Sequence, residues 1–204
     1  MKTKGFDSAQ PDIEFYISKA KHLNLNNLYR LKIFANFGSL RLKRKIMETV
    51  YINSPLGITK IIGDENGISV ISVSDVGTNE VSQTIPEVLQ EAVSQLNEYF
   101  EGKRTDFGLK LNPKGTEFQL KVWKALLEIP YGKTVSYMDQ TKKLGDVKAI
   151  RAVASANGKN PLWIVVPCHR VIGTNGSLTG YAGEIWRKKW LLEHENPSAQ
   201  QSLF

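Results

Sequence analysis

The run NPLWIVVPCHRVIG, residues 160–173, contains Cys168, the only cysteine of the 204-residue chain. Residues 162–166 are continuously apolar and end in β-branched side chains, which predicts a buried strand. Pro167 cannot continue a hydrogen-bonded ladder, so we expect the chain to bend there. Neighbouring residues of a regular strand point to opposite faces. A bend at the proline would instead let Cys168 and His169 share one pocket.

Two interpretations of Cys168 follow from its neighbours. A buried cysteine is ordinarily a small, unreactive apolar side chain. A reactive cysteine is a thiolate, and positive surroundings lower the thiol pKa below its free value of about 8.5. Here His169 can act as a base and Arg170 is a nearby cation, which favours the thiolate. A nucleophile beside a base is typical of covalent catalysis.

An amphipathic helix expected over residues 184–195 supplies a carboxylate for this histidine. Its apolar residues should face the core; they are Ile185, Trp186, Trp190, Leu191 and Leu192. Glu195 follows on the same side of the helix, whereas Glu193 and His194 lie further round and should be solvated. A carboxylate on the buried side needs a partner, and His169 is the obvious candidate.

Charge is distributed unevenly along the chain. Residues 47–108 carry 3 Lys+Arg against 10 Asp+Glu, residues 109–204 carry 14 against 7, and residues 1–46 carry 10 against 3. A polyanion that binds the folded part should therefore bind the basic carboxyl half. A single cysteine excludes an internal disulfide framework and a Cys-rich zinc site. Since no apolar stretch approaches the ~20 residues of a membrane span, we expect a soluble, cytoplasmic protein.

Four segments are expected along the chain. Residues 1–46 lack clear periodicity and end in a basic run, which we interpret as a poorly ordered extension, with a nucleic-acid-binding arm as the alternative. Residues 47–108 contain three short β-rich runs broken by SPLG and GDENG, which predicts two hairpins, followed by a helix that begins at Pro86. Residues 109–195 form a second domain, and residues 196–204 form a flexible tail.

The second domain begins with a helix and continues with a helix pair. Thr116 and Gln119 form a capping box that starts the first helix. Two helices follow, about residues 136–144 and 147–157, in a helix-turn-helix pattern that is a weak signal alone. The second of them carries Arg151 among small side chains, which let a helix approach a groove closely. These small residues are Ala149, Ala152, Ala154, Ser155 and Ala156.

PCHRVIG, preceded by NPLWIVV and followed by GYAG and WLLEHE, resembles the active-site region of the O6-alkylguanine-DNA alkyltransferases, also called methylated-DNA–protein-cysteine methyltransferases. The resemblance covers about residues 47–195 and is specific in the carboxyl half. It implies an α+β fold, with an amino-terminal ribonuclease-H-like α/β unit followed by an all-α-rich, winged-helix-like DNA-binding domain. It also implies DNA repair by irreversible, single-use transfer of an alkyl group from O6 of guanine, or O4 of thymine, in double-stranded DNA.

The resemblance assigns chemical roles position by position, and it implies neither a cofactor nor a metal. Cys168 is the implied alkyl acceptor, and His169 is the base that acts on it through a water. Glu195 orients the histidine, and Asn160 supports the active-site turn. Tyr137 crowds the target phosphate and donates a hydrogen bond to the base.

The resemblance also assigns the contacts with DNA. Arg151 is the finger that enters the duplex where the damaged base leaves, because the base must be flipped out to react. Its small neighbours Ala152, Ala154 and Ser155 let the helix lie close in the minor groove. The implied walls of the base pocket are Tyr181, Ala182, Val166 and Trp163.

Two positions depart from the pattern of the family. Trp163 stands where a small residue or proline is usual, and it would either narrow the pocket or pack behind it. Glu184 follows GYAG where glycine is common, and a carboxylate there could alter the tolerance for bulky alkyl groups. Two other functions stay open: a DNA-binding lesion sensor without activity, and a cysteine hydrolase with a Cys-His-Glu arrangement, which would not explain Arg151.

The chain ends in QQSLF, which resembles the short terminal motif by which bacterial repair proteins dock on the replication sliding clamp. Gln200, Leu203 and Phe204 would make this contact, with the apolar pair as anchor. The alternative is an ordinary disordered end. We otherwise expect a monomer that does not associate with membranes.

Overall fold

The computed structural model describes residues 46–74 and 81–196. They belong to one compact unit, residues 45–204. Nearly all of the expected extension and of the expected tail, including the QQSLF motif, lies outside the described residues. Among the helices of the described part, none combines the length and the apolar character needed to cross a membrane.

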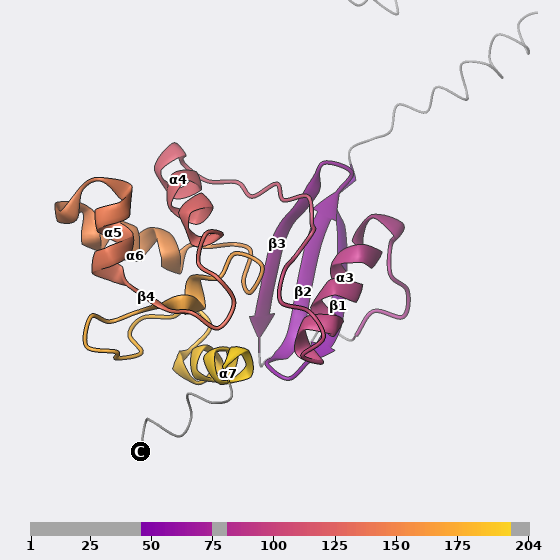
Figure 1. The fold of residues 1–204 in the computed structure, drawn as a ribbon. Helices are drawn as coiled ribbons and strands as arrows, with labels where there is room; N and C mark the ends of the chain where they lie inside the picture. The colour runs from indigo at the N-terminus through magenta and orange to yellow at the C-terminus, as the bar shows by residue number, and fades with distance from the viewer. Residues whose placement is uncertain (1–45, 75–80, 197–204) are drawn as a thin grey trace, which may run out of the picture. The chain divides into compact units, whose positions relative to one another are not determined.

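The amino-terminal part is a three-stranded antiparallel sheet in the order β1-β2-β3, which confirms the two predicted hairpins. The strands are β1 Glu48–Ser54, β2 Gly57–Asp64 and β3 Gly67–Ser74. Gly57 and Gly67 end the two turns with φ of 117° and 127°, a conformation that favours glycine. Helix α3, Glu87–Phe100, follows Pro86 as predicted and packs against the sheet (Figure 1) through one apolar face.

The carboxyl-terminal part begins with three helices. They are α4 Glu117–Leu126, α5 Tyr137–Leu144 and α6 Ile150–Gly158, with the short 3-10 helix η1, Val147–Ala149, before α6. The capping box of Thr116 and Gln119 is present. Trp123 of α4 donates a hydrogen bond from Nε1 to the carbonyl of Ala156 at 2.8 Å, which fixes α6 on α4. The predicted helix pair is therefore confirmed and firmly supported.

The predicted strand over residues 162–166 is wrong. These residues form buried turns, in which Ile164 adopts a φ of 71°. Only the start of the run touches a strand: Trp163 N donates to the carbonyl of Ile71 in β3 at 3.0 Å, and Ile71 N donates to the carbonyl of Pro161 at 2.8 Å. An apolar run signals burial, and its buried backbone groups can be satisfied by turns as well as by a ladder.

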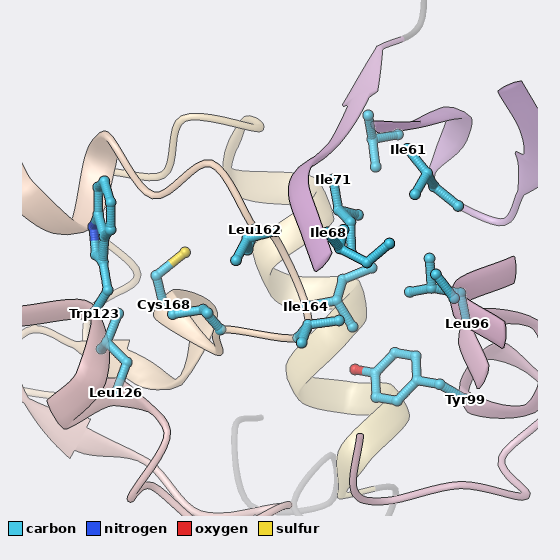
Figure 2. Packing of buried hydrophobic residues seen from close by; sticks show 14 of the residues in the cluster. Ile61, Ile68, Ile71, Leu96, Tyr99, Trp123, Leu126, Leu162, Ile164 and Cys168 are labelled. Atoms are coloured by element: carbon cyan, nitrogen blue, oxygen red, sulfur yellow. The ribbon is translucent and has the colours of Figure 1, made fainter. Parts of the chain in front are cut away.

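The buried side chains form one continuous cluster (Figure 2). It extends from Leu96 and Tyr99 of α3, through Ile71, to Trp123 and Leu126 of α4. Leu162, Ile164 and Cys168 belong to it as well. The turn that contains the cysteine is therefore held by packing against both parts of the fold.

The remaining elements surround the cysteine. They are the 3-10 helix η2 Cys168–Arg170, the parallel pair of β4 Val135–Ser136 and β5 Val171–Ile172, and helix α7 Ile185–Glu195. The predicted core face of the last helix is wrong at its start. Ile185 and Trp186 are 43% and 44% exposed, whereas Arg187 and Lys188 are buried. The charged pair is directed inward because carbonyl oxygens there accept its hydrogen bonds.

Candidate active site

Cys168 begins η2 directly after Pro167, where the chain bends as predicted. The thiol is 5% exposed, and the backbone N–H of Cys168 donates to the carbonyl of Val166 at 2.8 Å. This tight bend, in place of a strand, puts the cysteine and the following histidine on one short helical turn.

Asn160 fastens the turn before the cysteine to the thiol itself. Its Nδ2 donates to the carbonyl of Val166 at 2.7 Å and to Cys168 Sγ at 3.2 Å, and its Oδ1 accepts from Leu162 N at 3.0 Å. The amide is buried, so these hydrogen bonds are not weakened by water. Asn160 thus holds the loop and offers a hydrogen-bond donor to sulfur.

The Cys168 thiol is less acidic than we predicted from the residues beside it in the sequence. Burial raises the pKa of Cys168, and the hydrogen bond from Asn160, the charge of Lys188 and nearby backbone N–H groups only partly oppose this effect. Arg170, which we expected to act on the thiol, is instead paired with Glu195. The resting side chain is therefore a protonated thiol, and its reaction as a thiolate requires a base.

Lys188 is the cation that acts on the thiol, and the sequence did not single it out. Its ammonium group is buried on α7, where Nζ donates to the carbonyls of Val171 at 2.7 Å and Thr179 at 3.1 Å. It also lies 5.7 Å from the ring centroid of Tyr137. Burial lowers the pKa of Lys188 to about 8, so this positive charge persists at neutral pH.

His169 is oriented by Glu195 at the end of α7. Its Nε2 lies 2.8 Å from Glu195 Oε1, and both side chains are buried. A carboxylate only accepts, so Nε2 carries the proton and Nδ1 keeps a lone pair. Nδ1 is buried and has no hydrogen-bond partner in the described part of the protein. Burial lowers the pKa of His169, which makes the ring a neutral base with its free nitrogen at Nδ1.

Glu195 is the most heavily hydrogen-bonded side chain of the site. Oε1 accepts from His169, from Arg170 Nη2 at 2.9 Å and from the Tyr99 hydroxyl at 2.9 Å. Oε2 accepts from Arg170 Nε at 2.8 Å and from Gly132 N at 3.2 Å. Burial alone would raise the pKa of Glu195, but its hydrogen bonds and opposite charges lower it to about 2.

His194 also differs from the prediction. We expected it to be solvated, but its ring stacks on Trp190 at 4.8 Å and its Nε2 lies 2.7 Å from the carbonyl of Tyr99. Aromatic packing therefore fixes the end of α7 against α3. No periodicity in either helix distinguished this contact, because it joins residues 95 positions apart.

Two tyrosines lie near the thiol. Tyr137, at the start of α5, is half-buried and donates from its hydroxyl to the carbonyl of Gly180 at 3.2 Å. Burial raises the pKa of both Tyr137 and Tyr181, and in each case a charge on Cys168 would add to the effect. The Tyr181 hydroxyl is buried and has no hydrogen-bond partner within the described residues. A buried hydroxyl without a partner is uncommon in folded proteins.

Trp163 packs beside Tyr181. Its ring centroid lies 5.5 Å from that of Tyr181, and its indole occupies the space that a side chain at Gly183 would need. Val166 is buried in the core, and Ala182 is exposed. Of the four residues expected to line a base pocket, Trp163 and Tyr181 contact each other, whereas Val166 is a core residue and Ala182 is a surface residue.

The exposed face of α6 carries the residues expected to meet DNA. Arg151, Ala152 and Ser155 are exposed and Ala154 is half-buried, whereas Val153 and Ala156 are buried in the core. The face thus presents one long cation beside small side chains. In the described residues, no group of three or more His, Cys, Asp or Glu side chains is arranged to hold a metal ion.

Models of two protein domains match this chain. The 6-O-methylguanine DNA methyltransferase ribonuclease-like domain matches residues 46–113, and the DNA binding domain of the same family matches residues 117–197. The chain belongs to the O6-methylguanine-DNA methyltransferase family. It therefore has the α+β fold of that family, with an amino-terminal ribonuclease-like domain and a helical DNA-binding domain.

Individual relatives agree with this assignment. The methylated-DNA–protein-cysteine methyltransferase of Mycobacterium bovis is 46% identical over 156 residues, which are 74% of this chain and 94% of the relative. That of Methanosarcina acetivorans is 46% identical and covers 70% of this chain and 94% of its own. The activity of the chain is accordingly that of a methylated-DNA–protein-cysteine methyltransferase, which repairs DNA by alkyl transfer.

Solved structures support the same conclusion. The crystal structure of Mycobacterium tuberculosis O6-methylguanine methyltransferase matches with a TM-score of 0.66 and 45% identity over 74% of this chain and 94% of that one. A second structure of the M. tuberculosis protein, in complex with DNA, matches with a TM-score of 0.65 and 45% identity over 72% and 91% of the two chains.

Proposed function

We propose that Cys168 is the alkyl acceptor of this methyltransferase. In the transfer step the bond between the alkyl carbon and O6 of guanine breaks, and a bond between that carbon and Sγ forms. The thiol loses its proton and the guanine base gains one, so that guanine forms with a carbonyl at O6. The observation that carries this proposal is the arrangement of the sole thiol next to a neutral histidine whose unprotonated Nδ1 is buried and lacks a partner among the described residues.

His169 is the base in this proposal and accepts the thiol proton at Nδ1 through a water. Glu195 accepts the hydrogen bond from Nε2, which selects the required tautomer and stabilises the imidazolium that forms. Asn160 holds the turn and donates to sulfur, and this contact stabilises the developing thiolate. Arg170 keeps Glu195 ionised throughout, because it occupies both carboxylate oxygens.

Tyr137 donates a hydrogen bond to the guanine oxygen, on which negative charge develops as the alkyl group leaves. Its raised pKa keeps the hydroxyl protonated. Tyr181, Ala182, Val166 and Trp163 form the wall of the pocket that receives the flipped base. The Tyr181 hydroxyl, which has no partner among the described residues, supports this role, because a buried hydroxyl without a partner is costly unless a ligand supplies one.

The exposed face of α6 is the proposed DNA contact. Arg151 occupies the gap that the flipped base leaves, and Ala152, Ala154 and Ser155 permit close approach to the groove. The structure of the M. tuberculosis protein in complex with DNA supports a DNA contact for this chain. The basic character of the carboxyl half agrees with it.

The acceptor role is tested by mass spectrometry after incubation with duplex DNA that contains O6-methylguanine. We expect a gain of about 14 Da, a methyl group in place of a proton, on the peptide that contains Cys168. Cys168→Ala protein should bind the same DNA and gain nothing. Binding without any mass gain in the parent protein would indicate a lesion sensor instead, and repeated turnover of an ester would indicate a hydrolase.

The finger role of Arg151 is tested by two substrates. Arg151→Ala should slow transfer from duplex DNA while transfer from free O6-methylguanine stays unchanged, because the free base needs no flipping. Lys159→Ala, at an exposed position just after the same helix, is the control. An equal loss of transfer rate on duplex DNA and on the free base would contradict the proposed role of Arg151 in the duplex.

Three expectations from the sequence complete the proposal: the protein is cytoplasmic, it is a monomer, and its terminal Gln200, Leu203 and Phe204 dock on the sliding clamp. An apolar pair at a chain end suits a partner groove. Deletion of residues 200–204 should abolish binding to purified clamp and leave methyl transfer intact. Clamp binding that survives the deletion would contradict the proposed docking. Light scattering tests the oligomeric state, and we expect the mass of a monomer in solution.

A further inference from the structure

We propose that Tyr99, from the ribonuclease-like domain, is a positioning residue for alkyl transfer and acts through Glu195 and His169. The inference rests on the proposed roles of these two residues and extends them to a helix of the other domain. Tyr99 does not touch the thiol. Its hydroxyl donates a hydrogen bond to Glu195 Oε1, the oxygen that also accepts the hydrogen bond from His169.

The contact is direct and buried. The Tyr99 hydroxyl donates to Glu195 Oε1 at 2.9 Å, and the same oxygen accepts from His169 Nε2 at 2.8 Å. Tyr99 is fully buried and Glu195 is 5% exposed. Figure 2 shows the Tyr99 hydroxyl turned from α3 toward the ribbon of α7. Burial and the adjacent carboxylate raise the pKa of Tyr99 well above its usual value, so the phenol stays a hydrogen-bond donor.

Tyr99 is itself fixed from several sides. Its ring packs against Phe107 at 5.5 Å, Tyr131 at 6.3 Å and His194 at 5.1 Å between centroids. Its carbonyl oxygen lies 2.7 Å from His194 Nε2, and this second hydrogen bond joins the same residue to α7. The side chain and the main chain of Tyr99 thus hold two consecutive residues of α7. The hydroxyl cannot leave the carboxylate without disturbing α3.

The placement has a chemical consequence for the base. Oε1 accepts three hydrogen bonds, from Tyr99, His169 and Arg170. Each of these donors partly neutralises the same negative charge. The Tyr99 hydroxyl therefore reduces the extent to which Glu195 stabilises the protonated form of His169. Removal of the hydroxyl should favour the imidazolium and raise the pKa of His169. A larger fraction of the protein would then lack a free base at neutral pH.

The titratable and charged groups that face Glu195 and His169 come from several elements packed around them. They are Cys168 and Arg170 of η2, Tyr181 and, on α7, Lys188 and His194, Tyr99 of α3, and Tyr131 after α4. Tyr131 lies 5.7 Å from the guanidinium carbon of Arg170, and its hydroxyl is 3.4 Å from the carbonyl of His194. It contacts the same network without bonding Glu195. Tyr131 is therefore the matched control.

The test compares Tyr99→Phe and Tyr131→Phe with the parent in the full-length protein. Single-turnover methyl transfer from O6-methylguanine duplex DNA is measured across a pH series, together with affinity for undamaged duplex and with thermal unfolding. We expect Tyr99→Phe to slow transfer about tenfold at neutral pH, the factor that corresponds to one hydrogen bond to a charged group. The pH midpoint of the rate should move upward while DNA affinity stays unchanged.

The outcomes separate positioning from simple support of the fold. A lower unfolding temperature with the parental rate and pH midpoint would overturn the inference, as would an equal change of rate and midpoint in Tyr131→Phe. If the parent takes up no methyl group, the proposed function itself fails. If the parent reacts and Tyr99→Phe matches it, only this inference fails.

Discussion

Arg170 and Glu195 form a buried ion pair with two hydrogen bonds, Nε to Oε2 at 2.8 Å and Nη2 to Oε1 at 2.9 Å. Arg170 also donates from Nη1 to the carbonyl of Ile129 at 2.6 Å. The arginine next to the reactive histidine therefore serves the carboxylate rather than the thiol. It also ties η2 and the end of α7 to the chain that follows α4.

Replacement of the carboxylate should destabilise the protein and change its response to acid. Glu195→Gln leaves the Arg170 charge buried without its counterion, and we expect a loss of about 3–5 kcal/mol in the free energy of unfolding at pH 7. Because folding lowers the pKa of Glu195 from 4.5 to about 2, its contribution is fully present above pH 4.5 and is lost as the pH falls toward 2. The parent should therefore lose stability over that interval more steeply than the variant.

Denaturant unfolding at several pH values measures both effects. Glu193→Gln is the control, since Glu193 lies on the same helix in a partly exposed pair with Lys189 at 3.7 Å. Such a pair contributes little, about 0–1 kcal/mol. Equal stability of the Glu195 and Glu193 variants would contradict the buried pair.

Removal of the buried ammonium group should make the thiol less acidic. Lys188→Met keeps most of the side-chain length but removes the charge that lowers the pKa of Cys168. We expect the pH profile of thiol alkylation by iodoacetamide to move to higher pH and methyl transfer at pH 7 to slow. Lys189→Met, at the exposed neighbouring position, should keep the parental profile. A profile that is unchanged in both variants would show that Lys188 does not act on the thiol.

Truncation of Trp163 should broaden the range of alkyl groups. The indole packs on Tyr181 and occupies the space beside Gly183, so Trp163→Ala would enlarge the proposed base pocket. Transfer from O6-benzylguanine should then rise on the order of tenfold relative to transfer from O6-methylguanine. Trp186→Ala, which removes an exposed indole of α7, is the control. A benzyl-to-methyl ratio that stays constant would place Trp163 behind the pocket rather than in its wall.

Glycine at position 184 should stabilise the fold. Glu184 adopts φ 70° and ψ 154°, a region that is almost exclusive to glycine and costs about 1–3 kcal/mol for other residues. Glu184→Gly should therefore raise the free energy of unfolding by about 1 kcal/mol, after the entropy cost of glycine is subtracted. Glu184→Ala loses the same carboxylate contact with Trp186 Nε1 at 3.0 Å but keeps the strain. If alanine stabilises as much as glycine, the backbone is not the cause.

Local signals in the sequence predicted much of the fold. The hairpins followed from turn residues, and the start of α4 followed from the side chains of Thr116 and Gln119, which form the capping box. The position of Glu195 on the buried side of α7 followed from helical periodicity, and its contact with His169 is confirmed. Each of these elements depends on residues a few positions apart, which is the range over which sequence patterns are informative.

The errors concern contacts between distant segments. Residues 162–166 are mostly buried as expected, but their backbone is bonded by the edge of β3, which is distant in the sequence, as well as by the neighbouring Asn160 side chain, and periodicity shows neither partner. Trp186 is exposed and Lys188 is buried because carbonyl oxygens from Val171 and Thr179 receive the ammonium group. Helical periodicity indicates Tyr99 only as an apolar residue of its helix. Its hydroxyl acquires a role only when folding brings residue 195 beside it.

Because the chain has a single cysteine, the number of free thiols in a sample equals the number of protein molecules that have not yet reacted. Since Cys168 is the only thiol in the chain, a thiol reagent added to the denatured protein reads one equivalent for each molecule that is still able to react. In the proposed reaction, every repaired lesion converts one such thiol into a thioether, which the reagent does not detect. The absorbance of a single denatured sample would therefore report how much repair capacity has been consumed, without any measurement on the DNA.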